Sequence, residues 1–312
     1  MDFDFNNIAD LLSERAECNA RLKNIPYDGT PEVKELNGSK YLYCRKRIGS
    51  RVTSSYVGSY SEELHQLLLR SAKKARDLRR SLRHIEKALA SQGYSENDLS
   101  PKTSLNIDFA RANLKANIYD QAVLEGVATS FPQTEEIIEN GIVSGVRPTD
   151  VQKILNLKHA WEFILDKDIL ISKTNYYLLC HIARLVNEGF FYDGGRIRGV
   201  PVTIGGSSYV PPIPFEFEIK ERIDEVLSSE DGDIDKAVEL CLFCMRTQIF
   251  NDGNKRAAVI FANHYMVSHG LGLLVIPEAY VPEFKKLLVE FYESNNSTEI
   301  SSLMKEKCWR KL

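Results

Sequence analysis

The chain has 312 residues and a net charge of −3, and 43% of its residues are hydrophobic while 27% are charged. This composition is typical of a soluble globular protein and argues against a disordered or fibrous chain. No apolar run approaches the roughly 20 residues that cross a membrane. The acidic first five residues lack the basic start and apolar run of a signal peptide. We therefore expect a cytoplasmic protein with no membrane partner and enough length for two domains.

The N-terminal third predicts a β-hairpin followed by a long helix. Alternating residues over Ser39–Ile48 and Arg51–Gly58 indicate two strands, and Gly49–Ser50 indicates the turn between them. Ser61, which precedes two glutamates, is a typical helix start. Apolar residues at helical spacing then continue almost to Gln92.

This predicted N-terminal module, residues 1–95, is strongly basic. The stretch Lys40–Gly93 carries thirteen lysines and arginines and only four acidic residues, a local surplus of nine positive charges. Such asymmetry favours contact with a nucleic acid through residues 40–87, or docking on an acidic module. The alternative is a solvated helix face whose charges are paired within the molecule. Residues 96–104 are the predicted linker to the rest of the chain.

The cysteines and histidines indicate packing rather than metal binding. Cys241 and Cys244 have a metal-like spacing, but they lie in an apolar helical run with no second pair nearby. None of the six histidines lies in a metal-binding spacing. His264 would lie about two turns, roughly 12 Å, beyond Arg256 on one predicted helix, so we expect it to have a core or surface role.

The segment Gln248–Arg256 has the chemistry of an anion-binding turn, because the apolar run 257–262 directly after it predicts a buried helix. The first-turn N–H groups of a helix have no intrahelical partner, and the helix dipole favours negative charge there. Gly253 would let the backbone approach a ligand closely. Arg256 can make a two-pronged contact with a phosphate. Asp252 could hold a divalent cation that bridges phosphate oxygens.

This segment resembles the signature of the Fic (Fido) family, His-x-Phe-x-(Asp/Glu)-Gly-Asn-(Gly/Lys)-Arg, in the branch that contains the Doc toxin. Family members transfer part of a nucleotide, usually AMP from ATP, to a protein hydroxyl. The resemblance implies that Asp252 binds Mg²⁺ and that Asn254 and Arg256 hold phosphates. It also implies that backbone N–H groups from Gly253 to Lys255 form an anion hole.

The sequence departs from the family pattern at its catalytic position. Gln248 stands where the family carries the His that deprotonates the target hydroxyl. A neutral amide does not titrate in a useful range, so it cannot act as a general base. Val259 stands where many members carry a second Arg. The chain is compatible with a natural degenerate member and with an inactivating substitution of His by Gln.

The resemblance extends on both sides of the signature, over about residues 105–291. The predicted helices Leu178–Glu188 and Ala237–Met245 follow the order of the family. We therefore predict a mainly α protein whose residues 105–312 form a Fic-type helical core, preceded by the β-hairpin and long helix of the N-terminal module.

The passage Gly195–Pro212 resembles the β-hairpin flap with which the family aligns its target segment. Thr203, Ile204 and Tyr209 are the flap candidates. Its alternative is a plain surface loop, because two consecutive prolines cannot lie inside a regular interior strand.

The stretch before the core contains a candidate inhibitory motif. Gln121 to Gly126 resembles the (Ser/Thr)-x-x-x-Glu-(Gly/Asn) sequence of the family, whose Glu reaches into the nucleotide site. Here Glu125 would hold that position, although Gln121 replaces the Ser or Thr. Contact between Glu125 and Arg256 is one hypothesis. The other is an exposed Glu at a helix end that Gly126 caps.

The resemblance implies Mg²⁺ as the cofactor, ATP or another nucleotide as co-substrate or ligand, and a protein Ser, Thr or Tyr hydroxyl as the target. Three functions stay open. The chain is an enzyme that works without the His or has lost it by substitution. It is a pseudoenzyme that binds a nucleotide and signals through its basic module. Or it is a nucleic-acid-associated regulator that uses residues 40–87.

Overall fold

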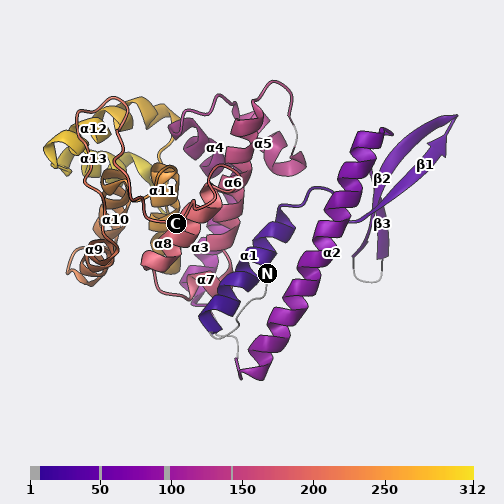
Figure 1. The fold of residues 1–312 in the computed structure, drawn as a ribbon, viewed down its shortest axis with the longest axis horizontal. Coiled ribbons are helices and arrows are strands. Elements are labelled where there is room, and N and C mark those ends of the chain that lie inside the picture. The colour runs from indigo at the N-terminus through magenta and orange to yellow at the C-terminus, as the bar shows by residue number, and fades with distance from the viewer. Residues whose placement is uncertain (1–7, 49–50, 95–98, 142) are drawn as a thin grey trace. The chain divides into compact units, whose positions relative to one another are not determined.

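The computed structural model describes residues 8–48, 51–94, 99–141 and 143–312. The chain divides into two compact units, which are Met1–Glu96 with Glu139–Gly141, and Asn97–Ile138 with Ile142–Leu312. Figure 1 shows the elements of the first unit in indigo to purple and those of the second in magenta to yellow. The protein is mainly helical, as predicted.

The first unit contains two helices and a three-stranded antiparallel sheet in the order β1-β2-β3. Its elements are α1 Ile8–Lys23, β1 Thr30–Leu36, β2 Ser39–Ile48, β3 Arg51–Ser59 and α2 Glu62–Ser91. The predicted hairpin is β2 paired with β3, and its predicted turn, Gly49–Ser50, lies outside the described residues. The sequence did not predict α1 or β1. Three charged residues and a proline in the seven residues of β1 mask its strand character.

Helix α2 begins at its predicted capping residue. The Ser61 hydroxyl accepts a hydrogen bond of 3.1 Å from the backbone N–H of Leu64, which satisfies one of the unpaired donors of the first turn. The apolar face of α2 packs against α1, where Leu11 meets Ile85 and Leu89 in a buried cluster. The first unit therefore has a hydrophobic core of its own.

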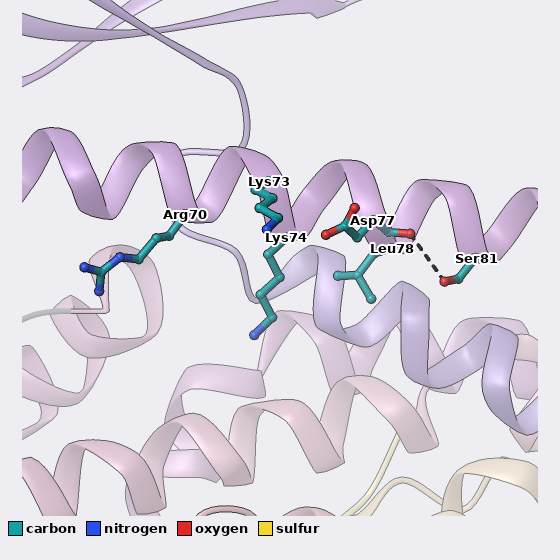
Figure 2. A pocket seen from close by; sticks show the side chains of 6 residues that line it. All are labelled: Arg70, Lys73, Lys74, Asp77, Leu78 and Ser81. Carbon is teal, nitrogen blue, oxygen red and sulfur yellow. Dashed lines mark hydrogen bonds between the residues drawn. The ribbon is translucent and has the colours of Figure 1, made fainter. Parts of the chain in front are cut away.

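Part of the excess charge of the basic module is paired within the unit. Asp28 lies 2.8 Å from the Lys46 ammonium and 2.6 Å from the Arg79 guanidinium. Burial alone would raise the pKa of Asp28, but the hydrogen bonds from these two cations lower it overall. Other cations project from α2 into a surface hollow, which Figure 2 shows lined by Arg70, Lys73, Lys74, Asp77, Leu78 and Ser81.

The second unit is a helical domain with one short two-stranded sheet. Its helices are α3 Pro101–Ala112, α4 Leu114–Leu124, α5 Phe131–Asn140, α6 Pro148–Ile164, α7 Lys167–Leu170, α8 Tyr176–Val186, α9 Glu216–Ser228, α10 Asp233–Thr247, α11 Asn254–Ser268, α12 Val281–Ser294 and α13 Thr298–Leu303. The strands are β4 Leu273–Leu274 and β5 Trp309–Arg310. The predicted linker is too long, because Ser100 caps α3 and residues 101–104 are helical. Its residues 96–98 lie outside the described part.

Helix α11 is the central element of this domain and packs against α10, α8, α6 and α3 (Figure 1). Nearly all of its side chains are buried, including His264. The His264 ring lies 2.9 Å from the Thr174 hydroxyl and 2.8 Å from the Ile169 carbonyl oxygen. Burial lowers the pKa of His264 to about 4, so the ring is neutral at physiological pH. His264 is therefore a core residue.

Cys241 and Cys244 are buried free thiols in α10. Across the described residues, no group of three or more His, Cys, Asp or Glu side chains could hold a metal ion. The expectation that these two cysteines pack in the core is confirmed.

Among the helices that the structure describes, none is both long enough and apolar enough to cross a membrane.

Candidate functional site

The site is built on the loop that joins α10 to α11. Gln248 follows the last residue of α10 with φ of 49°, and Gly253 precedes α11 with φ of 75°, so two left-handed residues bracket the loop. Ile249 and Phe250 between them are buried in the core. The loop is thus anchored by apolar side chains, while Asn251 and Asp252 are exposed.

The side chain of Asn254 closes this loop on itself. Its Oδ1 accepts a 2.9 Å hydrogen bond from the Phe250 N–H, and its Nδ2 donates to the Phe250 carbonyl at 2.8 Å. The Nδ2 also donates to Gln248 Oε1 at 3.1 Å. The expected phosphate-holding role of Asn254 could therefore use its backbone N–H, because its amide is committed to the shape of the loop.

Gly253 is required for space as well as for backbone conformation. A Cβ atom at this position would lie 2.7 Å from Asn187 Oδ1, which is closer than real Cβ contacts. Asn187 is buried, and its Nδ2 donates to the carbonyls of Asp252 at 2.9 Å and Gly194 at 3.1 Å. Asn187 thus joins the loop to α8, and Gly253 is the residue that allows this close approach.

Arg256 lies in the first turn of α11 and is only 1% exposed. Its guanidinium donates to the Val186 carbonyl at 2.7 Å and to Asp252 Oδ2 at 2.8 Å. Its Nε is buried and has no hydrogen-bond partner. A buried, oriented guanidinium with a free donor lies where the first-turn N–H groups and the helix dipole also favour an anion.

Glu125 lies beside this guanidinium. Its carboxylate is 3.6 Å from Arg256 Nε and 3.7 Å from the Lys255 ammonium, and its side chain is only 12% exposed. These distances allow charge attraction without a hydrogen bond, and Oε1 of Glu125 is likewise buried without a partner. Glu125 is therefore not the exposed helix-end residue of the second hypothesis, although Gly126 does end the helix in a left-handed conformation.

Helix α4 is held against α11 by the residue that replaces the Ser or Thr of the motif. The Gln121 amide donates to the Arg256 carbonyl at 2.8 Å, and its oxygen accepts from the Trp161 indole N–H at 2.9 Å. Both side chains are buried. This bridge fixes the end of α4, and hence Glu125, over the first turn of α11.

Gln248, at the position of the family His, has its side chain engaged locally. Its Nε2 donates to the Met245 carbonyl at 2.6 Å, and its oxygen accepts from Asn254. The hydroxyl of Tyr292 lies close to this side chain. Burial, and then the charge of Glu125, raises the pKa of Tyr292, so this neighbour stays a protonated phenol rather than a base.

The passage after α8, which we call the flap after its predicted role, is not a β-hairpin. Residues 201–215 contain no strand, and a single turn closes where Ser207 N–H donates to the Ile204 carbonyl at 3.2 Å. The expected hairpin is therefore wrong in this detail. Prolines at positions 201, 211 and 212 remove the N–H donors that a strand ladder needs.

Buried Arg198 replaces that ladder and ties the flap to the site. Its guanidinium donates to five backbone carbonyls, of which two lie at the end of α10 and three in the flap. The shortest bonds reach Gln248 O at 2.5 Å and Pro212 O at 2.6 Å. Burial lowers the pKa of Arg198, but the guanidinium pKa starts so high that the charge is retained.

The tip of the flap is fixed by a second set of contacts. Glu293 accepts hydrogen bonds from Ser208 N–H at 2.8 Å and from the Ser207 hydroxyl at 3.2 Å. The Arg246 guanidinium lies 4.2 Å from the centre of the Tyr209 ring, within the range of a cation–π contact. Of the other flap candidates, Ile204 is half-buried and Thr203 is exposed.

The loop, the buried Arg256 and the attached passage after α8 form the candidate site. Residues 173–266 match the model of the Fic/DOC family, so this part of the chain is a Fic/DOC domain and the resemblance seen in the sequence is confirmed. Residues 6–66 match a domain of unknown function, DUF6788. No curated protein matches the chain.

Solved structures share the fold. Fic-1 (aa134–508) from C. elegans is 19% identical, with a TM-score of 0.52 over 78% of this chain and 73% of that one. A Fic-domain-containing signaling protein from Bacteroides thetaiotaomicron is 17% identical, with a TM-score of 0.55 over 72% and 91%. A Fic family protein from Desulfovibrio desulfuricans is 14% identical, with a TM-score of 0.52 over 68% and 73%. Proteins with Fic domains generally transfer AMP or similar groups to proteins.

Sequence reasoning missed several residues that shape the site. Arg198 lies within the passage Gly195–Pro212 that resembles the family flap, in the run Gly-Arg-Ile-Arg-Gly, where nothing distinguishes it from Arg196. Asn187, Tyr292 and Glu293 carry no signal either, because each acts through contacts with residues far away in the chain.

Proposed function

We propose that the loop Gln248–Arg256 binds the phosphates of a nucleotide, with ATP as the first candidate, together with Mg²⁺. The observation that carries this proposal is the buried guanidinium of Arg256 in the first turn of α11, whose Nε makes no hydrogen bond and faces the Glu125 carboxylate at 3.6 Å. A buried donor without a partner is costly, and an anion at this position would satisfy it. The adjacent N–H groups and the close-packed Gly253 supply the rest of the cradle.

The chain offers a partial site for Mg²⁺ that suits this ion. Asp252 is half-exposed and ion-paired to Arg256. Within the described residues no cluster of side chains could hold a metal ion by itself. Mg²⁺ commonly takes one or two carboxylates and completes its shell with water and phosphate oxygens. Asp252 would hold the ion, which would supply positive charge against the phosphates, and Arg256 would contact the phosphates.

The position of Glu125 beside Arg256 and Lys255 supports a regulatory role for this residue. Glu125 places a negative charge beside the cations that would receive the phosphates, and Gln121 holds it there. We infer that Glu125 is inhibitory and must yield its place to a phosphate group before the nucleotide binds fully. This role rests on like-charge repulsion between a carboxylate and a phosphate.

Transfer to a protein hydroxyl needs a base that Gln248 does not supply. The backbone at position 248 is left-handed, a conformation in which His is more frequent than most residues. A His would therefore fit this position, where its ring could accept a proton from a hydroxyl held beside the flap. We propose a protein Ser, Thr or Tyr hydroxyl as the target, and a nucleotide-binding pseudoenzyme as the alternative function of the chain with Gln248.

Two measurements test this proposal. Calorimetry should show binding of ATP with Mg²⁺ to the wild type and a loss of about 10-fold or more for Arg256→Ala, because a charge-assisted phosphate contact is removed. Lys286→Ala, in an exposed surface pair of α12, is the matched control. Absence of ATP binding, or unchanged affinity in Arg256→Ala, would contradict the site.

The second measurement separates the enzyme from the pseudoenzyme. Gln248→His should transfer label from α-labelled ATP to proteins of a cell lysate, whereas the wild type should not. If Gln248→His binds ATP but labels no protein, alone and combined with Glu125→Gln, the pseudoenzyme is favoured over the transferase.

A further inference from the structure

The three-stranded sheet of the first unit has one face that does not belong to the core. Alternation along the strands and the pairing of β2 with its neighbours define this outer face. It carries Glu32, Lys34, Tyr41, Tyr43, Arg45, Arg47, Ser54 and Tyr56. The opposite face holds the buried Leu42 and Cys44 of β2. The outer face is therefore a surface, independent of the proposed nucleotide site.

Three tyrosines gather on this face instead of in the core. The Tyr56 ring lies 5.6 Å from that of Tyr43, in an edge-to-face arrangement, and 6.2 Å from that of Tyr41. Tyr56 is 57% exposed. An edge-to-face cluster holds each ring in a fixed orientation while part of its π-surface faces solvent. Such a fixed aromatic platform is the element on which unpaired bases stack.

The charges beside the tyrosines are mainly positive. Arg45 and Arg47 are exposed, and neither makes an ion pair with any described residue. The Lys34 ammonium lies 4.3 Å from the centre of the Tyr43 ring and 3.6 Å from the carboxylate of Glu32. One acid thus faces three cations. The face attracts a polyanion, and its two unpaired guanidinium groups suit phosphate oxygens.

The tyrosines and the cations together indicate which kind of polyanion this face would bind. Duplex DNA keeps its bases stacked inside the helix, and its phosphates alone would not need a tyrosine platform. An acidic protein segment has charges but no planar bases. A single strand has both phosphates and free base faces. We propose that the outer sheet face binds single-stranded nucleic acid, with a base on the exposed Tyr56 and phosphates on Arg45 and Arg47.

Fluorescence anisotropy of labelled 12-nucleotide oligothymidylate and oligouridylate, added to the full chain, tests this proposal. Tyr56→Ala should weaken binding by about 5- to 100-fold, the range found for the loss of one stacking partner, while Tyr56→Phe should bind like the wild type. Arg47→Gln should lower the slope of log K against log salt by about 0.7. Lys286→Gln is the control for a surface cation elsewhere. The two oligonucleotides show whether the 2′-hydroxyl contributes.

Three outcomes would overturn the proposal. The first is equal affinity of Tyr56→Ala and the wild type. The second is a duplex of the same length binding as tightly as the single strand. The third is displacement of the oligonucleotide by polyglutamate at equal charge concentration, which would mark the face as a site for acidic proteins. Thermal melting shows whether each variant is folded. If Tyr56→Ala does not fold, Arg47→Gln, which changes an exposed residue, still tests the proposal.

Discussion

Neutralising Glu125 should weaken the fold and strengthen nucleotide binding at the same time. Glu125→Gln keeps the size and shape of the side chain and removes its charge. In the protein, that charge lies 3.6 Å from Arg256 Nε and 3.7 Å from the Lys255 ammonium. The same charge would lie next to the phosphates of a bound nucleotide, so its removal has opposite effects on the two equilibria.

The magnitude follows from the geometry. Two unit charges about 3.6 Å apart attract by about 5 kcal/mol at an effective dielectric constant of 20. The cost of desolvating the carboxylate offsets most of this attraction. Arg256 keeps its bond to Asp252, and Lys255 is partly screened by solvent because it is one-third exposed. We expect the free energy of unfolding to fall by about 1 kcal/mol, and the affinity for ATP with Mg²⁺ to rise by about 5- to 30-fold.

Urea unfolding measures the first effect and calorimetry with ATP and Mg²⁺ measures the second, both at one ionic strength. Glu290→Gln, which removes an exposed carboxylate paired with Lys286 in α12, should change neither quantity. The reasoning is refuted if Glu125→Gln is less stable than the wild type and binds ATP no more tightly. Glu125 would then only stabilise the packing of α4.

Other consequences can be measured directly. Gly253→Ala should lower the free energy of unfolding, measured with urea, by more than about 2 kcal/mol. Gly206 is also left-handed but lies in open space, so Gly206→Ala should lower it by about 1 kcal/mol. Equal losses would show that the contact with Asn187 is unimportant. Arg198→Met removes the donor to five carbonyls, so the free energy of unfolding should fall by more than about 3 kcal/mol. Limited proteolysis of this variant should cut the flap first. His264 has a lowered pKa of about 4 in the folded protein, so its contribution to stability is complete above pH 6.5 and falls as the pH drops toward 4. Protonation of His264 should account for about 2 kcal/mol of the fall in the free energy of unfolding between pH 7.5 and pH 5. If His264→Asn showed the same pH dependence of stability as the wild type, this reasoning would be wrong.

The elements that the sequence predicted well are those with a local signal. Ser61 before two glutamates marks the start of α2, because a capping side chain acts within its own first turn. The apolar run after Arg256 predicted the buried helix α11. The alternating residues of β2 and β3 predicted their pairing. In each case the residues that determine the structure are close together in the chain.

The errors have physical reasons as well. β1 is an edge strand in which proline and charges are tolerated, so its composition hid it. The flap was expected to be a hairpin from its resemblance to the family, but its prolines cannot donate to a ladder and Arg198 takes over the carbonyls. The linker was extended too far, although Ser100 before Pro101 is a typical helix start.

The sequence by itself determined the composition of the turn before α11 and the absence of a titratable base at position 248. Asp252, Gly253 and Arg256 lie within five consecutive residues of the chain, and an amide at position 248 cannot titrate wherever it lies. Only the tertiary structure decided that Glu125 faces Arg256, that Asn187 fills the space that Gly253 leaves open, and that three tyrosines share the outer face of the sheet. These arrangements depend on how helices and strands pack, and packing brings together side chains whose separation in sequence carries no information about their distance in space.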